Sequence, residues 1–193
     1  EYRRILESIC PDGLTGRDLG RFDKGLYGCS EMFVNGFLKL IEAGIIPEDE
    51  LETYGGDDSR LPMSGMATYT PGMEISGGSL GQGLVIGVGM ALALRHKRNP
   101  AFVYNSMSDG ELDEGSTWEA AMAAAHHRLD NLICLVDINN QQADGPSGKV
   151  LGFEPLADKW SAFGWHVQRV DGNDLPAVLA AFDAARALAE AKP

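Results

Sequence analysis

The stretch AFVYNSMSDGELDEGSTWEAAMAAAHHRLDNLICLVDINNQQADG, residues 101–145, decides the fold. It holds two apolar runs of strand length, 101–107 and 131–137, and between them an alanine-rich segment, 114–129, with the composition of a helix. A strand, a helix and a second strand predict a right-handed crossover and a parallel pair of strands. Each apolar run is followed by a cluster of carboxylates, amides and glycine, at the end of the strand where parallel sheets bind their ligands.

The rest of the chain extends the same pattern on both sides of this stretch. We predict helices at 30–43, 80–97, 155–163 and 174–190, a helical turn after Pro47, a third strand at 165–170, a long ordered loop at 55–79 and a second loop at 138–152. Small residues in the helix at 80–97 indicate close packing against a neighbour. Alternating strands and helices predict an α/β fold in which a parallel sheet is sandwiched between helices.

The two polar clusters supply half of a site for a hard cation. Asp109 and Asn139 lie thirty positions apart, and consecutive parallel strands bring such residues to the same edge of the sheet. One carboxylate, one amide oxygen and a backbone carbonyl at Gln141 are too few ligands for a calcium cage, but they suit Mg²⁺ that is shared with a diphosphate. A structural alternative stays open, because an Asp-Gly or Asp-x-Asn sequence after a strand is often only a turn.

A glycine-rich stretch, GGSLGQGL at 77–84, opens the predicted helix at 80–97. Helix-start amides and bare glycine backbone form a natural seat for an anion. The spacing G-x-G-x-x-x-G at 81–87 departs from the dinucleotide fingerprint and no apolar strand precedes it, so we do not favour a nucleotide-binding dehydrogenase. The chain therefore combines a half-site for a metal with a seat for phosphate.

In order and spacing these segments resemble the diphosphate-binding domain of the transketolase family of thiamine diphosphate enzymes. The similarity is carried by SDGELDEGSTWEAAMAAAHHRLDNLICLVDINNQQADG (108–145), with its Asp-Gly and an Asn thirty positions on, by TPGMEISGGSLGQGLVIGVGMALA (70–93) and by PLADKWSAFGWHVQRVDGND (155–174). It covers about residues 20–190. The resemblance implies the thiamine diphosphate-binding fold, one diphosphate-binding domain over 1–193, and pyrimidine-binding and C-terminal domains on a partner subunit.

The resemblance also implies roles for individual residues. The metal, Mg²⁺ or Ca²⁺, would be bound by the side chains of Asp109 and Asn139 and by the carbonyl of Gln141. The implied cofactor-binding residues are Gly78, Leu80, Gln82, Ser108, Asp109, Gly110 and Asn139. Glu114 and Glu119 match acidic residues near the subunit interface and are the implied catalytic candidates for a proton relay. The alternative is that both only complement the dipole at the start of a helix.

Members of the family transfer a two-carbon ketol unit, and a glutamate from another domain activates the aminopyrimidine ring of the cofactor. The resemblance therefore implies a transferase that is active only with a partner subunit, as an α₂β₂ heterotetramer. Three departures affect the pocket, because Ser108 stands at a family glycine, and Leu26 and Ser64 stand at family histidines. A leucine cannot donate a hydrogen bond or shuttle a proton. We therefore expect an atypical donor or acceptor, as in specialised metabolism.

Two other functions stay open. One is a subunit similar to the E1 component of 2-oxo acid dehydrogenases, which would pass an acyl unit to a lipoyl or acyl-carrier domain. Its donor would be a 2-oxo acid, whereas the donor of a transketolase is a ketose. The other, from a different class, is a non-catalytic cofactor-binding homologue, although the retained pair of Asp109 and Asn139 argues against it.

The overall composition disfavours several other classes of protein. The chain has 193 residues and a net charge of −12, with 28 acidic and 16 basic residues, so we expect neither nucleic acid nor a membrane surface as a partner. The three cysteines, Cys10, Cys29 and Cys134, have no metal-binding spacing and predict no disulfide framework. With no apolar stretch of membrane-spanning length and no signal-peptide pattern at the start, we expect a cytoplasmic protein.

Overall fold

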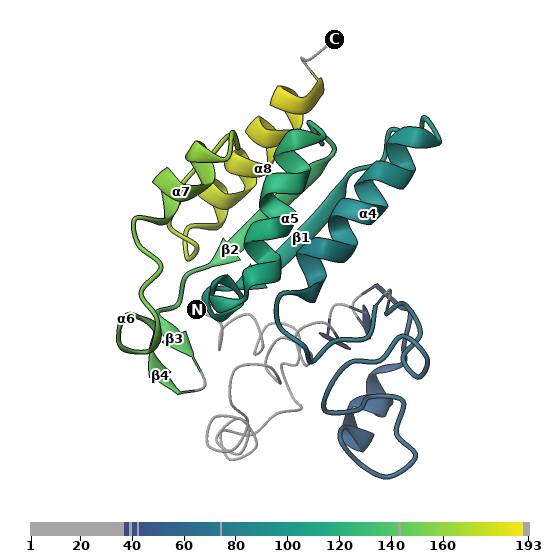
Figure 1. The fold of residues 1–193 in the computed structure, drawn as a ribbon. Helices are drawn as coiled ribbons and strands as arrows, with labels where there is room; N and C mark the ends of the chain where they lie inside the picture. Colours follow the sequence, from purple (N-terminus) through teal and green to yellow (C-terminus); the bar gives the residue numbers. More distant parts are fainter. Residues whose placement is uncertain (1–36, 39, 42, 74, 143, 191–193) are drawn as a thin grey trace. The chain divides into compact units, whose positions relative to one another are not determined.

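The computed structural model describes residues 37–190, except 39, 42, 74 and 143 (Figure 1). The chain divides into two compact units, Glu1–Gly78 and Ser79–Pro193. All three predicted metal ligands belong to the second unit. The prediction of a single domain over 1–193 stays a prediction.

Two parallel strands form the centre of the second unit. β1 (Val103–Ser108) pairs with β2 (Leu132–Asp137), in a register that places the first residues of the strands opposite each other and the last residues opposite each other. α5 (Gly115–His126) lies between the strands in the chain and supplies the crossover. The predicted strand–helix–strand arrangement within 101–145 is therefore confirmed.

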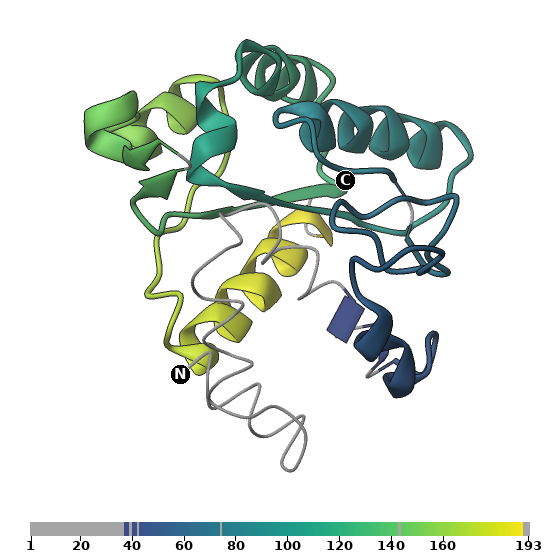
Figure 2. The ribbon, with the colours of Figure 1, turned by 90° about the horizontal axis from the view of Figure 1, so that it is seen from below.

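Helices cover both faces of this strand pair, as Figure 2 shows. α4 (Gln82–His96) and α5 lie on one side, and α8 (Leu175–Glu190) lies on the other. Phe182 of α8 packs on Tyr104 of β1 with the ring centroids 5.9 Å apart. The expected arrangement of parallel strands between helices is confirmed for the second unit.

The core of the second unit lies between α4, α5 and the strands. Its buried apolar side chains include Leu84, Val88, Met107, Ala121, Ala124, Leu132 and Trp160. α4 approaches the strands closely at Gly87, where an added Cβ would lie 3.6 Å from a methyl group of Leu132 and 3.7 Å from one of Val103. Gly87 therefore serves the close packing that the small residues of α4 predicted.

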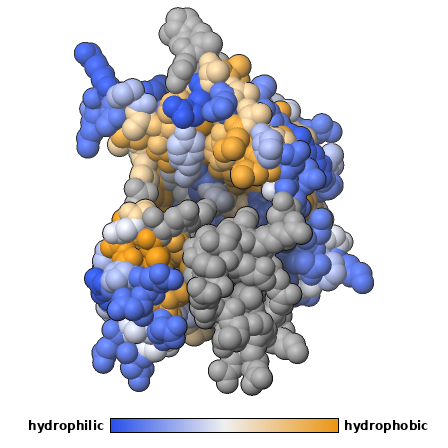
Figure 3. All heavy atoms as spheres, turned by 180° about the vertical axis from the view of Figure 1, so that it is seen from behind, coloured by the Kyte–Doolittle hydropathy of each residue, from blue (hydrophilic) through white to orange (hydrophobic). Residues whose placement is uncertain are grey.

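α8 carries apolar side chains that face solvent as well as side chains that face the strands. Leu175 is 64% exposed and Leu179 is 55% exposed, and apolar surface is visible over α8 in the view from behind (Figure 3). α8 therefore contacts the strands through only part of its apolar surface.

Two expectations for the second half of the chain are wrong. Residues 165–170 form no strand, because among the described residues no neighbouring strand accepts or donates their backbone hydrogen bonds. The segment 138–152 is not a plain loop. It contains a short hairpin, β3 (Gln141–Gln142) with β4 (Gly145–Pro146), followed by a turn of helix, α6 (Ser147–Val150).

The remaining predicted helices are found. α7 (Leu156–Ala162) corresponds to the helix expected near 155–163, and α8 to the helix expected at 174–190. No helix in the part of the chain that the structure describes is long and apolar enough to cross a membrane.

The first unit is held by a small apolar core and a network of polar contacts. Phe37, Ile46 and Leu61 are buried together, and η1 (Glu48–Thr53) is the helical turn expected after Pro47. The described residues 37, 38, 40 and 41 are helical, and the rest of the helix predicted at 30–43 lies outside the described residues. Leu26 also lies outside them.

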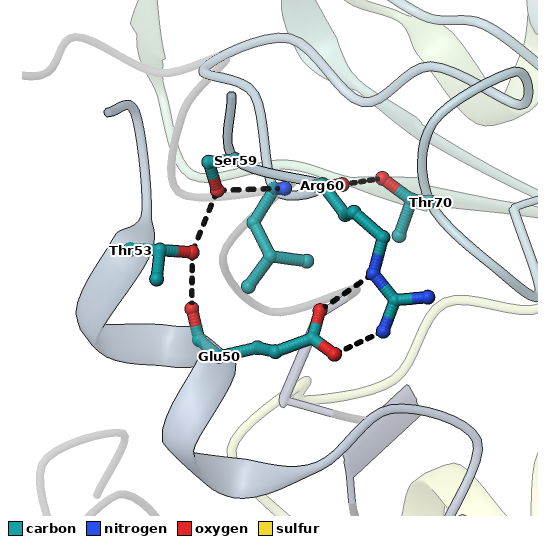
Figure 4. A network of polar contacts seen from close by, with 6 residues as sticks. Glu50, Thr53, Ser59, Arg60 and Thr70 are labelled. Carbon is teal, nitrogen blue, oxygen red and sulfur yellow. Dashed lines mark hydrogen bonds and ion pairs between the residues drawn. The ribbon is translucent and has the colours of Figure 1, made fainter. Parts of the chain in front are cut away.

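The polar network in the first unit joins η1 to the irregular segment that follows it (Figure 4). Arg60 donates to both carboxylate oxygens of Glu50, and Thr53 and Ser59 share a hydroxyl hydrogen bond of 2.8 Å. The buried hydroxyl of Thr70 donates to the carbonyl oxygen of Arg60. These contacts hold part of the segment 55–79, whose described residues form no helix or strand, as its composition predicted.

Cys134 on β2 gives the second unit a measurable pH dependence. It is a free thiol, and burial raises its pKa to about 12. Because the folded protein holds this proton more tightly than the unfolded chain does, the contribution to stability is complete below about pH 8.5, and it falls by about 1.4 kcal/mol per pH unit above that value until the folded pKa is reached. In urea unfolding between pH 8 and pH 10, we expect the wild type to lose about 1–2 kcal/mol more than Cys134→Val. Parallel curves for the two proteins would contradict this prediction.

Candidate functional site

The parallel register places the two polar clusters at the same end of the strand pair. Ser108 and Asp137, the last residues of β1 and β2, lie opposite each other. Asp109 follows β1 directly, and Asn139 follows β2 by two residues. The two predicted metal ligands therefore leave neighbouring strands at the same edge, which is the arrangement that the spacing predicted.

The carboxylate of Asp109 is completely buried and only half satisfied. Its exposed fraction is 0%, and its Oδ2 accepts a hydrogen bond of 2.7 Å from the hydroxyl of Ser147. Oδ1 is also buried, and it has no hydrogen-bond partner. Leaving a buried carboxylate oxygen without a partner is costly. Such an atom fits the oxygen ligand of a cation.

Asn139 begins a tight turn that returns the chain toward Asp109. Its Oδ1 accepts a hydrogen bond of 2.9 Å from the backbone N–H of Gln141, and Asn140 adopts a left-handed backbone conformation with φ at 60°. Asparagine tolerates this conformation better than most residues do. The amide oxygen keeps a second lone pair that can ligate a metal.

The side chain of Gln142 lies beside Gly110, the residue that follows Asp109. A Cβ added at Gly110 would lie 3.7 Å from Cγ of Gln142, and the side-chain Nε2 of Gln142 is buried without an acceptor. An acceptor of Asp109 and a donor of Gln142, whose side chain lies beside the next residue, Gly110, are thus both buried without a partner. A ligand that carries both a cation and an anionic oxygen would satisfy the two atoms together.

The oxygen atoms of these residues can be compared with the ligands that a bound metal requires. Among the described residues no group of three or more His, Cys, Asp or Glu side chains could hold a metal ion alone. Asp109, Asn139 and the carbonyl of Gln141 supply hard oxygen ligands, which suit Mg²⁺ or Ca²⁺ when a diphosphate and water complete the shell. The residues present therefore fit a metal-bound diphosphate.

Glu111 ties the end of β1 to the start of α4. This buried carboxylate accepts 3.2 Å hydrogen bonds from the backbone N–H groups of Gly81 and Ser108. Ser116, on α5, binds the same glycine, because its hydroxyl donates to the carbonyl oxygen of Gly81 at 3.1 Å. Glu111 therefore fixes the backbone immediately around Asp109.

Gly81 sits where no side chain fits. Its φ of 75° is left-handed, and an added Cβ would lie 2.6 Å from Cβ of Glu114 and 2.6 Å from the hydroxyl of Ser116. This contact places Glu114 beside the first turn of α4. Glu114 and Glu119, which is on α5, are both exposed, so they are available to another chain. Their implied role in a proton relay stays a prediction.

The other predicted cofactor residues are divided between the two units. Gly78, in the first unit, has a left-handed φ of 118°, and an added Cβ would lie 3.7 Å from the hydroxyl of Ser64. The backbone N–H of Gly77 also donates to the carbonyl of Gly65 at 2.8 Å, so these two stretches lie together. In the second unit Leu80 is half-buried and Gln82 is exposed.

Sequence reasoning missed three residues of the site, which are Glu111, Gln142 and Ser147. Glu111 had a signal, because Ser-x-x-Glu at 108–111 has the spacing of a capping box. Gln142 and Ser147 had none, since only the turn at Asn140 and the β3–β4 hairpin bring them to Asp109.

Comparison with known proteins agrees with this geometry. Residues 27–193 match the family described as transketolase, thiamine diphosphate binding domain. The transketolase of Leishmania mexicana has a similar structure, with a TM-score of 0.71 and 31% identity over 78% of this chain and 24% of that one. The parallel α/β unit with polar residues at its strand ends thus belongs to the class of thiamine diphosphate binding domains. The chain belongs to the transketolase family.

Three curated relatives are more similar still. A transketolase family protein of Sinorhizobium fredii, y4mO, whose function is uncharacterized, is 71% identical over 78% of this chain and 54% of its own length. One subunit of the apulose-4-phosphate transketolase of Actinobacillus succinogenes is 46% identical over 72% of this chain and 51% of its own. The 6-deoxy-6-sulfo-D-fructose transketolase subunit SqwG of Clostridium sp. is 43% identical over 81% of this chain and 57% of its own length. The chain spans about half the length of these relatives.

Proposed function

We propose that this chain binds the diphosphate of thiamine diphosphate through Mg²⁺ (or Ca²⁺) and forms one subunit of an enzyme that transfers a two-carbon ketol unit. The observation that carries the proposal is the buried carboxylate of Asp109, which keeps one oxygen unpartnered at the end of β1. It lies within the segment that matches the thiamine diphosphate binding domain.

The chain's own residues would divide the work of holding the cofactor. Asp109, Asn139 and the carbonyl of Gln141 would bind the metal, and the amide of Gln142 would donate to a diphosphate oxygen. At Gly110 the absence of a side chain leaves the backbone open to the diphosphate. When bound, the cofactor supplies the nucleophilic carbon and the electron sink that ketol transfer needs.

The companion of this chain would be a second subunit. Two of the relatives are named as subunits of a transketolase, which supports a partner that carries the pyrimidine-binding half. The exposed carboxylates of Glu114 and Glu119 would face that partner and take part in a proton relay between paired sites. We propose an α₂β₂ assembly that is inactive without the partner.

The donor or acceptor would be atypical for a transketolase. Position 64, where the family resemblance implies a histidine, holds a serine, and its short hydroxyl side chain lies beside Gly78. A site without that histidine loses a hydrogen-bond partner for a hydroxylated sugar, and unpaired hydroxyls lower the affinity for the sugar. The names of the relatives include apulose 4-phosphate and a sulfonated deoxy sugar, which supports a modified ketose as the donor.

The direct test is a transfer assay with the full-length chain and its companion subunit, supplied with thiamine diphosphate and Mg²⁺. We expect a two-carbon unit to move from a ketose phosphate or a modified ketose to an aldose acceptor, and no turnover when either subunit or the cofactor is omitted. Product masses identify the transferred unit.

Two outcomes of this assay would contradict the proposal. Turnover only with a 2-oxo acid and a lipoyl or carrier acceptor would indicate an E1-like subunit instead. Cofactor binding without turnover across ketose and 2-oxo donors would indicate a non-catalytic homologue.

A further inference from the structure

Ser147 lies at the centre of the candidate site, although neither its position in the sequence nor its residue type predicted this. Its exposed fraction is 0%, like that of Asp109, and its hydroxyl donates to Oδ2 of that carboxylate at 2.7 Å. The backbone N–H of Ser147 donates to the carbonyl oxygen of Asn140 at 3.2 Å. One residue therefore bonds both to the end of β1 and to the turn that carries Asn139.

This double attachment matters because the two metal ligands come from different strands. The carboxylate of Asp109 can rotate about its terminal bond, which exchanges Oδ1 and Oδ2 and changes their direction. A hydrogen bond to Oδ2 removes that freedom and leaves Oδ1 as the oxygen without a partner. The bond to Asn140 holds the adjacent turn in register with the carboxylate at the same time.

A purely structural role explains the arrangement less well. Ser147 is the first residue of α6, which has only four residues, and its side chain does not cap that helix. Burying a serine hydroxyl against a carboxylate whose other oxygen stays orphaned gives the fold one hydrogen bond and a buried charge. A cation bound at Oδ1 would give that oxygen a partner and balance the charge.

We propose that Ser147 is a positioning residue for the metal site, which holds the Asp109 carboxylate so that Oδ1 faces the cation and keeps the Asn139 turn beside it. The inference rests on the proposed binding of a metal diphosphate. Groups that orient a metal ligand without touching the metal typically change metal affinity by about 10- to 100-fold when they are removed.

The test measures binding, and it uses the full-length chain with its companion subunit. Calorimetry with thiamine diphosphate at stepped Mg²⁺ concentrations gives the Mg²⁺ concentration at half-maximal cofactor binding. In Ser147→Ala we expect this midpoint to rise by about 10- to 100-fold, while the cofactor affinity at saturating Mg²⁺ returns close to the wild-type value. Ser147→Thr keeps the hydroxyl and should restore the midpoint. Ser161→Ala, at an exposed serine of α7, is the matched control and should leave it unchanged.

The outcomes separate this inference from the proposed function. If the wild type binds the cofactor without any need for Mg²⁺, the proposed function fails and the inference fails with it. If the wild type needs Mg²⁺ but folded Ser147→Ala has the wild-type midpoint, or Ser147→Thr is as impaired as Ser147→Ala, only the inference fails. Should Ser147→Ala not fold, Ser147→Cys decides, because its weak S–H donor must raise the midpoint above that of Ser147→Thr.

Discussion

Asp109→Asn is expected to weaken Mg²⁺-dependent binding of thiamine diphosphate by about 30-fold or more and to reduce turnover at least as much. Removing one charged partner from a buried interaction costs about 2–5 kcal/mol, and every 1.4 kcal/mol is a factor of ten. The substitution keeps the shape of the side chain and an oxygen that can accept from Ser147, so the loss would come from the missing charge. Calorimetry of the assembled protein with and without Mg²⁺ measures the affinity.

The stability of the same variant distinguishes a ligand from a structural residue. Without metal, the buried carboxylate of Asp109 has one oxygen without a partner, so neutralising it should not destabilise the metal-free protein. Asp158→Asn, at an exposed carboxylate of α7, is the control and should change neither property. The metal assignment is refuted if Asp109→Asn binds the cofactor as the wild type does.

Gly81→Ala is expected to destabilise the folded chain by about 2–5 kcal/mol. A left-handed φ costs an L-residue about 1–2 kcal/mol, and forcing extra volume into a packed contact costs about 1–3 kcal/mol. The new Cβ would overlap Glu114 and Ser116 at 2.6 Å, and moving it away would break the hydrogen bond between Gly81 and Glu111. Urea unfolding measures the change.

Gly89→Ala in the same helix is the matched control for this change. Nothing lies within 4 Å of a Cβ added at Gly89, and its backbone is helical. Alanine is favoured over glycine in a helix by up to about 1 kcal/mol, so this variant should be slightly more stable than the wild type. Equal stabilities for the two alanine variants would show that the close contact at Gly81 does not constrain the fold.

The elements that the sequence predicted are those with a strong local pattern. β1, β2, α4, α5, α7 and α8 all lie where apolar runs or helical composition placed them. The third strand at 165–170 failed because a strand needs a neighbour, and apolar composition alone does not show whether one is present. The hairpin in 138–152 was missed because strands of two residues leave no periodicity to detect.

In the candidate site, too, the residues that were predicted have a local sequence pattern, and two of the three that were missed have none. Asp109, Gly110 and Asn139 were found because each follows a recognisable strand at a characteristic spacing, and Glu111 could have been found from its capping-box spacing. The contacts of Ser147 and Gln142 with the Asp109–Gly110 segment link residues 32 to 38 positions apart. No local pattern encodes such contacts, because they form only after the chain has turned at Asn140.

The sequence by itself determined the class of fold, the family and which polar residues end neighbouring strands, because these follow from hydrophobic runs and from spacing along the chain. Only the tertiary structure decided which oxygen of Asp109 accepts a hydrogen bond and which has no partner. It also placed the unpartnered amide of Gln142 beside Gly110 and left no room for a side chain at Gly81. These are properties of atoms brought within a few ångströms from distant positions, and their energies depend on burial and geometry that appear only when the core has closed.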